Sequence, residues 1–361
     1  MSVTILPTDS NWKYSPYNWY VCPSYAQANN GGAYCKIGFT GTSMTLGISA
    51  ASILPGKDIS LRYSVDNGSF ETYTYNTSSA ALTKTGLSPG THLLELWYYK
   101  GWWENIGGTA PNRWSGNYMV YITGLIIDDG QTSAPVSKAT RPYNYLHIGD
   151  SISEGIRAAG GIIQPGCADG TKTFSLYIGD GLNAETGVVS YGGTSFNSGF
   201  NEIPSANTYY SLYSSGKSRL ISGQFYPIPD FIGCNHGTNG ANVGELVIFL
   251  GLLRAACPLT TKIYIIIPVG GYSKSILIAD VNTYKAAHPE DVHIYIIDLG
   301  PAYTIGLNAF GNANQQSDDG LHPLAETNAH LGSYMSALMA MTNTQTVTML
   351  QNRRTFRTMT I

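Results

Sequence analysis

Short apolar or alternating runs, separated by turn residues, make up the first third of the chain. Each run has the length of one strand and none has a helical period. Four such runs are residues 43–48, 59–65, 92–98 and 119–127, and turn signals at 66–68 and 88–90 separate strands. Evenly spaced short strands of this kind predict a β-sandwich or jelly roll.

The pattern changes after a polar, Gly- and Pro-containing stretch at residues 128–135, which predicts a domain boundary. Apolar strands then alternate with helical patterns, which predicts a parallel sheet covered on both faces, a three-layer α/β/α domain. The strands are expected at 143–148, 188–191, 230–234, 262–269 and 292–299, and the helices near 153–159, 242–256, 275–288 and 324–341. We therefore predict a β-sandwich over 1–135, an α/β domain over 136–343 and a C-terminal tail over 344–361.

Few residues of this chain are charged: 12%, against roughly 25% in an average soluble protein. The net charge of −3 gives no basic footprint, so nucleic acid is not an expected partner. No apolar run reaches the roughly 20 residues that span a bilayer, so no membrane insertion is expected. The many Tyr and Gly residues suit a secreted or extracellular protein that faces sugars. The chain shows no signal peptide, and a cytoplasmic location stays open.

The five cysteines allow one disulfide, between Cys22 and Cys35, or free buried thiols throughout. Neither a CxxC pair nor a His-rich spacing suggests zinc, and we expect no metal or cofactor.

The first candidate for chemistry is Gly149-Asp150-Ser151, which follows a predicted buried strand. We expect the Ser151 hydroxyl at the carboxyl end of that strand, beside the N-terminus of a helix whose free amides stabilise a developing negative charge. An ordinary helix N-cap serine has the same local pattern.

The second candidate is Asp319-Gly320-Leu321-His322. Asp319 and His322 lie three residues apart in a Gly-containing turn. The carboxylate can then accept from one imidazole nitrogen while the other faces a serine. A surface turn with a solvated histidine is the alternative.

Two further segments follow predicted strands. Gly237-Thr238-Asn239 places an amide that can donate to an oxyanion, although Asn is also a common turn residue. Gly192-Gly193 ends another strand, where a backbone N–H can approach a substrate closely.

These four segments, in this order, resemble the four signature blocks of the SGNH (GDSL-like) hydrolases. The resemblance covers roughly residues 143–341, and four separate elements agree in order and context. It implies that Ser151 is the nucleophile, His322 its base and Asp319 the orienting acid, with an oxyanion hole formed by the backbone N–H groups of Ser151 and Gly193 and the side chain of Asn239.

The third block departs from the family pattern. Gly240 stands where the family usually has Asp. This departure concerns the side chain that supports the loop and not the Asn239 amide donor itself. Gly233-Cys234-Asn235 also fits a bare G-x-N, but the strand-to-block spacing favours Asn239. Should a substitution of Asp319 cost more activity than one of His322, His236 would be the alternative base.

A β-sandwich ahead of such a domain also resembles the carbohydrate esterase family 2 deacetylases. That resemblance implies a serine esterase that removes O-acetyl groups from carbohydrate. Acyl transfer by the same triad and an inactive carbohydrate-binding or adhesion protein are the alternatives. Candidate substrate contacts are Asp150, Trp102, Trp103 and His236, although aromatic residues of a β-sandwich more often belong to its core.

Overall fold

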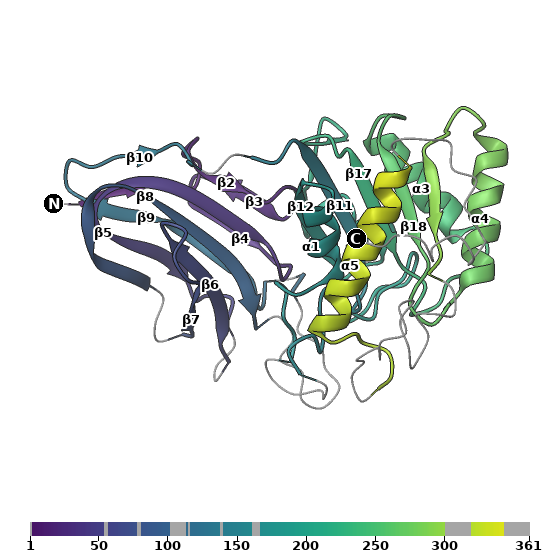
Figure 1. Ribbon diagram of the computed structural model, residues 1–361, viewed down its shortest axis with the longest axis horizontal. Helices are drawn as coiled ribbons and strands as arrows, with labels where there is room; N and C mark the ends of the chain where they lie inside the picture. Colours follow the sequence, from purple (N-terminus) through teal and green to yellow (C-terminus); the bar gives the residue numbers. More distant parts are fainter. Residues whose placement is uncertain are drawn as a thin grey trace, which may run out of the picture.

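A computed structural model of the protein describes residues 2–53, 57–77, 81–101, 113–114, 116–137, 140–160, 167–299 and 319–342. The chain forms a large curled antiparallel sheet followed by a smaller parallel sheet with helices on its faces, and the two lie side by side (Figure 1). The predicted fold class is confirmed.

The N-terminal β domain is one ten-stranded sheet whose central order is β3-β4-β9-β5-β8-β6-β7. It curls around a single core that includes Ile37, Phe39 and Leu94. Two long strands, β5 (Tyr34–Ser49) and β8 (Ala81–Lys100), run through the curl. The others are β1 (Ser2–Ile5), β2 (Lys13–Tyr14), β3 (Trp19–Cys22), β4 (Tyr25–Ala28), β6 (Ile59–Val65), β7 (Glu71–Tyr75), β9 (Val120–Asp128) and β10 (Ser133–Ala134).

One predicted turn is wrong. Residues 88–90 do not reverse the chain but lie inside β8. The pairing with β5 shifts there, because Gly41 faces Gly90 while Ser43 faces Thr85. Pro89 and its neighbours thus form an irregularity that bends a long strand, a position where a strand tolerates Pro. The predicted turn at 66–68 does connect β6 to β7, and Asp66 and Asn67 adopt positive φ there.

The α/β domain contains a five-stranded parallel sheet in the order β12-β11-β17-β18-β19. Helices α1 and α5 pack on one face with Tyr145 and Tyr264, and α3 and α4 pack on the other with Ile148 and Ile265. The strands are β11 (Tyr143–Gly149), β12 (Ala184–Ser190), β17 (Phe231–Asn235), β18 (Lys262–Ile266) and β19 (Ile294–Ile297). The helices are α1 (Phe174–Gly181), α3 (Glu245–Ala256), α4 (Lys274–Ala287) and α5 (Ala325–Met341).

Short elements connect β12 to β17. They are the helix α2 (Ala206–Tyr209) and two small hairpins, β13 (Leu212–Ser214) with β14 (Lys217–Ser218) and β15 (Leu220–Ile221) with β16 (Gln224–Phe225).

The strand order makes β11 the switch point of the sheet, because the chain proceeds to β12 on one side of β11 and then to β17 on the other. Open parallel sheets bind ligands outside the carboxyl ends of the strands at such a point. Residues that follow β11, β12 and β17 therefore meet at one edge.

The helix predicted near 153–159 is not formed. Residues 151–159 make a series of turns, in which Gly155 has a φ of 79° and Arg157 a φ of 62°. Left-handed residues cannot continue a right-handed helix. Ser151 consequently lies at the start of a turn segment and not beside a helix N-terminus, which corrects that expectation.

The β domain covers the edge strand β12. The Asn18 side chain donates to the carbonyl of Val188 at 2.7 Å and accepts from the N–H of the same residue at 3.3 Å. The Asn30 side chain donates to the carbonyl of Ser190 at 2.9 Å. Both asparagines are buried, so β-domain side chains satisfy backbone groups that a sixth strand would otherwise pair.

All five cysteines are free thiols, so Cys22 and Cys35 form no disulfide. Among the described residues, none of the helices is long and apolar enough to cross a membrane.

Candidate active site

Ser151 follows β11 at the switch point and is 8% exposed. The residue before it, Asp150, is fully buried and accepts from the N–H of Ile152 at 3.1 Å, which fixes the turn that begins at the serine. Within the described residues, no hydrogen bond engages the backbone N–H of Ser151. The strand end thus presents a hydroxyl together with an amide that has no hydrogen-bond partner among the described residues.

His322 and Asp319 form a pair in the loop before α5. The imidazole Nδ1 lies 2.7 Å from Oδ2 of Asp319, and the other carboxylate oxygen accepts from the N–H groups of Leu321 and His322. With the carboxylate ionised, Nδ1 carries the proton and Nε2 offers a lone pair. Nε2 is buried and has no hydrogen-bond partner among the described residues.

The environment of His322 favours the neutral imidazole. Burial lowers the pKa of His322 below its ordinary value, and the charge of Arg157 lowers it further, while Asp319 opposes both. A neutral imidazole with one bonded and one open nitrogen is the form that accepts a proton from a hydroxyl.

Arg157 joins the His322 loop to the turn segment that begins at Ser151. Its guanidinium lies 3.3 Å from Oδ2 of Asp319, the oxygen that also contacts His322. Arg157 is only six residues beyond Ser151 and is itself buried. The contact links the predicted acid and base to the turn segment that follows the predicted nucleophile, and among the described residues no hydrogen bond joins Nε2 of His322 to Ser151.

Asn239 lies between the ends of β11 and β12. Its Nδ2 donates to the carbonyl of Thr194 at 3.0 Å and lies 3.5 Å from Oδ2 of Asp150. Thr194 directly follows Gly193, and Asp150 directly precedes Ser151. The side-chain amide of Asn239 thus contacts the neighbours of Ser151 and Gly193, and donation to an oxyanion would replace one of these two bonds.

Gly193 occupies a position that requires glycine. Its φ is 77°, and a Cβ at this residue would lie 2.6 Å from the ring of Phe200. Like Ser151, Gly193 has a backbone N–H that no hydrogen bond engages within the described part of the chain. A side chain would displace this amide.

A buried ion pair supports the Gly193 loop. Arg113 and Glu154 each have side chains 1% exposed, and their closest atoms are 2.6 Å apart. The second oxygen of Glu154 accepts from the N–H of Gly192 at 3.0 Å, and Arg113 also donates to the carbonyl of Asn29 at 3.1 Å. Arg113, which precedes β9 in the chain, is thus linked through Glu154 to the loop of Gly193.

Burial raises the pKa of Asp150 to about 7, and the charge of nearby Glu154 adds to the rise. Burial likewise raises the pKa of Glu154, while Arg113 opposes that shift. The candidate site therefore holds two carboxyl groups that lie beneath the edge of the sheet in a water-poor environment.

The remaining predicted residues separate into two groups. Asn235 lies in β17 and its Nδ2 donates to the carbonyl of Ile266 at 3.0 Å, so its side chain bonds within the fold. His236 is 1% exposed, and its Nε2 lies 2.5 Å from the hydroxyl of Tyr209. Burial lowers the pKa of His236 to about 3. Trp102 and Trp103 lie outside the described residues.

Sequence reasoning did not find Arg113, Glu154 and Arg157. Each lies far along the chain from the group it contacts, and none belongs to a recognised motif. Glu154 follows Ser151 by three residues, so its place after the Gly-Asp-Ser segment was the only available signal.

Neither a family model nor a curated protein matches the sequence. Solved structures do share its fold over nearly its whole length. A family two carbohydrate esterase from Clostridium thermocellum, in complex with cellohexaose, is 17% identical and covers 92% of this chain and 99% of its own, with a TM-score of 0.70. An acetyl xylan esterase from the rumen bacterium Butyrivibrio proteoclasticus is 14% identical, covers 95% and 99%, and has a TM-score of 0.70.

A salicylyl-acyltransferase from a tetracycline biosynthetic pathway is also similar, at 15% identity, with coverage of 95% and 98% and a TM-score of 0.61. At these identities the likeness concerns the fold. The chain has the two-domain fold of these family two carbohydrate esterases, a parallel-sheet α/β domain preceded by a curled antiparallel β domain.

Proposed function

We propose that this protein is a serine esterase that hydrolyses O-acyl esters of carbohydrate, most of all O-acetyl esters. The observation that carries the proposal is the His322–Asp319 pair. The buried Nε2 of His322 has no hydrogen-bond partner within the described residues, and the carboxylate of Asp319 contacts Arg157 in the turn segment that begins at Ser151. A hydroxyl, a neutral imidazole and an orienting carboxylate are what acyl transfer requires.

In the proposed mechanism, the Ser151 oxygen attacks the ester carbonyl while Nε2 of His322 takes the hydroxyl proton. Asp319 stabilises the imidazolium that forms. The oxyanion receives hydrogen bonds from the N–H groups of Ser151 and Gly193 and from the amide of Asn239. The intermediate collapses, and the sugar alcohol leaves with the proton from His322. Water then attacks the acyl-enzyme with the same assistance and releases the acid, so the chemistry uses no metal or cofactor.

The carbohydrate part of the proposal is supported by the neighbours in fold, since one binds cellohexaose and another is an acetyl xylan esterase. The low content of charged residues, 12% of the chain, agrees with a neutral polymer as substrate. A polymeric substrate of this kind implies a secreted enzyme.

Acyl transfer to another alcohol is a second candidate, favoured by the acyltransferase that shares the fold. The same residues serve both reactions, which differ in whether water or an alcohol reaches the acyl-enzyme. The intact Ser151, His322 and Asp319 set weighs against an inactive binding or adhesion protein.

The test is release of acetate from acetylated xylan, mannan and chitooligomers, with Ser151→Ala as the matched variant. We expect release by the wild-type chain and a loss of several orders of magnitude in the variant, with an unchanged melting curve. Adding free sugar acceptors and analysing the products separates hydrolysis from transfer. Equal turnover by the folded variant would refute the mechanism.

A further inference from the structure

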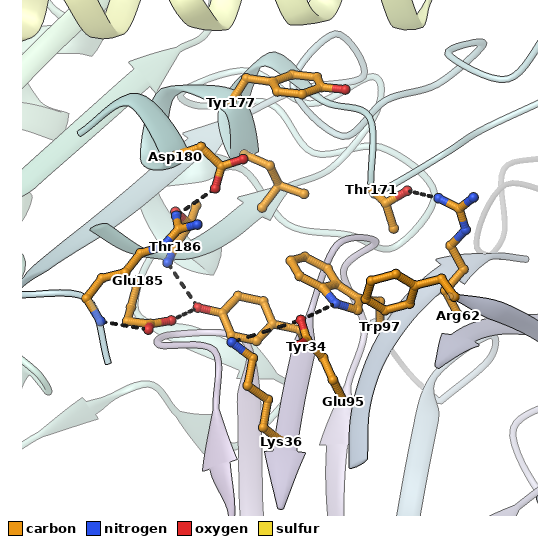
Figure 2. Close-up of a pocket in the computed structure, with 13 residues that line it drawn as sticks. Tyr34, Lys36, Arg62, Glu95, Trp97, Thr171, Tyr177, Asp180, Glu185 and Thr186 are labelled. Carbon is orange, nitrogen blue, oxygen red and sulfur yellow. Dashed lines mark hydrogen bonds and ion pairs between the residues drawn. The ribbon is translucent and has the colours of Figure 1, made fainter. Parts of the chain in front are cut away.

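A cavity lies between the two domains (Figure 2), and Ser151 is not among the residues that line it. Its volume is about 320 Å³, within the range of about 300–1,000 Å³ that small-ligand sites occupy. Strands β5, β6 and β8 line one side, and α1 and the start of β12 line the other.

This cavity lies at the amino edge of the parallel sheet. Glu185 and Thr186, at the start of β12, line it, whereas Gly149 pairs with Ser190 at the far end of the same two strands. At about 3.3 Å per residue, the strand separates Glu185 from Ser190 by roughly 16 Å. A ligand in this cavity does not occupy the candidate active site.

The charges that line the cavity balance. Three cations (Lys36, Arg62 and Arg141) face three carboxylates (Glu95, Asp180 and Glu185). Arg141 pairs with Asp180 at 2.6 Å, Lys36 lies 4.0 Å from Glu95, and Arg62 donates to the hydroxyl of Thr171 at 3.3 Å. Two of the three cations therefore already contact a carboxylate, and Arg62 contacts a neutral hydroxyl. The lining therefore favours a neutral ligand that both donates and accepts hydrogen bonds.

Aromatic rings supply the apolar part of the lining. The half-buried Trp97 packs on Tyr34 with ring centroids 4.6 Å apart, and its indole N–H donates to Glu95 at 3.0 Å. The hydroxyl of Tyr34 in turn donates to Glu185. Figure 2 shows Trp97 and Tyr34 on one side of the cavity and Tyr177 and Asp180 of α1 on the other. Phe70 is 48% exposed and completes the lining.

A neutral ligand with an apolar face and a rim of hydroxyls matches these features. A pyranose ring is such a ligand, because its C–H face packs on an aromatic ring while its hydroxyls bond to flanking charged groups. We propose that the cavity binds a sugar unit of a neutral oligosaccharide as a non-catalytic subsite. That the sugar belongs to the polymer being deacylated rests on the proposed function.

The experiment titrates the full chain with xylohexaose and cellohexaose, which carry no ester, and follows the amide and indole N–H resonances by NMR. We expect saturable shifts of the Trp97 indole N–H and of the amides of Thr171 and Tyr177. The Phe70→Ala variant, at an exposed position where truncation is tolerated, should weaken binding at least threefold, and Trp97→Leu at least tenfold. Ile221→Ala, which removes a comparably exposed apolar side chain elsewhere, is the matched control.

Three outcomes would overturn the subsite: no binding of either hexasaccharide, shifts confined to residues at the carboxyl edge such as Gly193 and Asn239, or unchanged affinity in both folded variants. Tighter binding of a hexagalacturonate would refute the argument from neutral charge. Since none of these ligands carries an ester, failure of the esterase proposal shows only in the acetate assay and leaves this result unaffected.

Discussion

The ion pairs at the two edges of the parallel sheet differ in how far they are exposed to water. At the amino edge, Arg141 and Asp180 pair with 38% and 57% of their side chains exposed. At the carboxyl edge, Arg113 and Glu154 pair with side chains 1% exposed, and Nε2 of His322 is buried with no partner among the described residues. Water screens the charges of the exposed pair, whereas burial shifts the pKa values of ionisable groups around Ser151. The amino edge is suited to holding a ligand and the carboxyl edge to reacting with one.

The largest effect expected at the carboxyl edge comes from His322→Ala. Removal of the open Nε2 leaves Ser151 without a base, and we expect kcat to fall by about 10⁴–10⁶-fold. Asp319→Asn should cost at least tenfold less, because the acid only orients and stabilises the imidazolium. Steady-state kinetics on p-nitrophenyl acetate, with melting curves as the control for folding, measures both. A larger loss in Asp319→Asn would point to another base, with His236 the next to test.

Asn239→Ala and Asn235→Ala sharpen the distinction between reacting and supporting groups within that edge. Loss of an oxyanion donor should lower kcat of Asn239→Ala about 10²–10³-fold with little change in KM. Asn235 bonds to Ile266 inside the sheet, so its removal should mainly cost about 1–3 kcal/mol of unfolding free energy. A rate defect found only in Asn235→Ala would move the oxyanion donor to that residue.

A smaller effect is expected from Glu154, which touches the Gly193 loop but not the reacting atoms. Glu154→Leu removes the acceptor for the N–H of Gly192, and we expect kcat to fall about tenfold with KM nearly unchanged. Glu154→Gln keeps an acceptor and should recover most of the rate. Wild-type kcat in Glu154→Leu would show that the ion pair with Arg113 serves stability alone.

The smallest expected effect is on the pH profile of kcat/KM. His322 acts as a neutral base, so activity should fall as the pH drops through its lowered pKa, below about 6.5. Arg157→Gln removes a charge that lowers this pKa and should move the acid limb upward, whereas Asp319→Asn should move it downward. Asp150, with a pKa near 7, titrates in the same range, and Asp150→Asn is the control. Identical limbs in all variants would assign the profile to a different group.

The sequence was most informative where one local pattern decides one structure. Buried strands such as Lys262–Ile266 appear in the sequence as apolar runs, and the Gly-Asp-Ser and Asp-x-x-His segments carry their own spacing. The helix predicted near 153–159 failed because the buried Ile152 and Ile156 have helical spacing, while Gly155 and Arg157 adopt positive φ. Backbone conformation at those two positions leaves no trace in a hydrophobic pattern.

Other features could not be predicted because their determinants are distant in the chain. Helix α1 contains two glycines, and Gly179 and Gly181 each lie where a Cβ would contact Thr186 or Ser336. Its stability therefore comes from close packing against β12 and α5 and not from intrinsic propensity. The pair of Arg113 and Glu154 spans 41 residues, and no local pattern couples them.

The asparagine contacts along β12 bear on how this protein tolerates domain exchange. The Asn18 side chain occupies both polar groups of Val188 much as the peptide unit of a neighbouring strand would. An α/β domain severed from its partner would expose an unpaired strand edge, and such edges recruit other chains into aggregates. The N-terminal domain thus covers the strand edge and keeps the α/β domain from aggregating. Any chimera built on this α/β domain must supply amides that donate to the same two carbonyls, those of Val188 and Ser190.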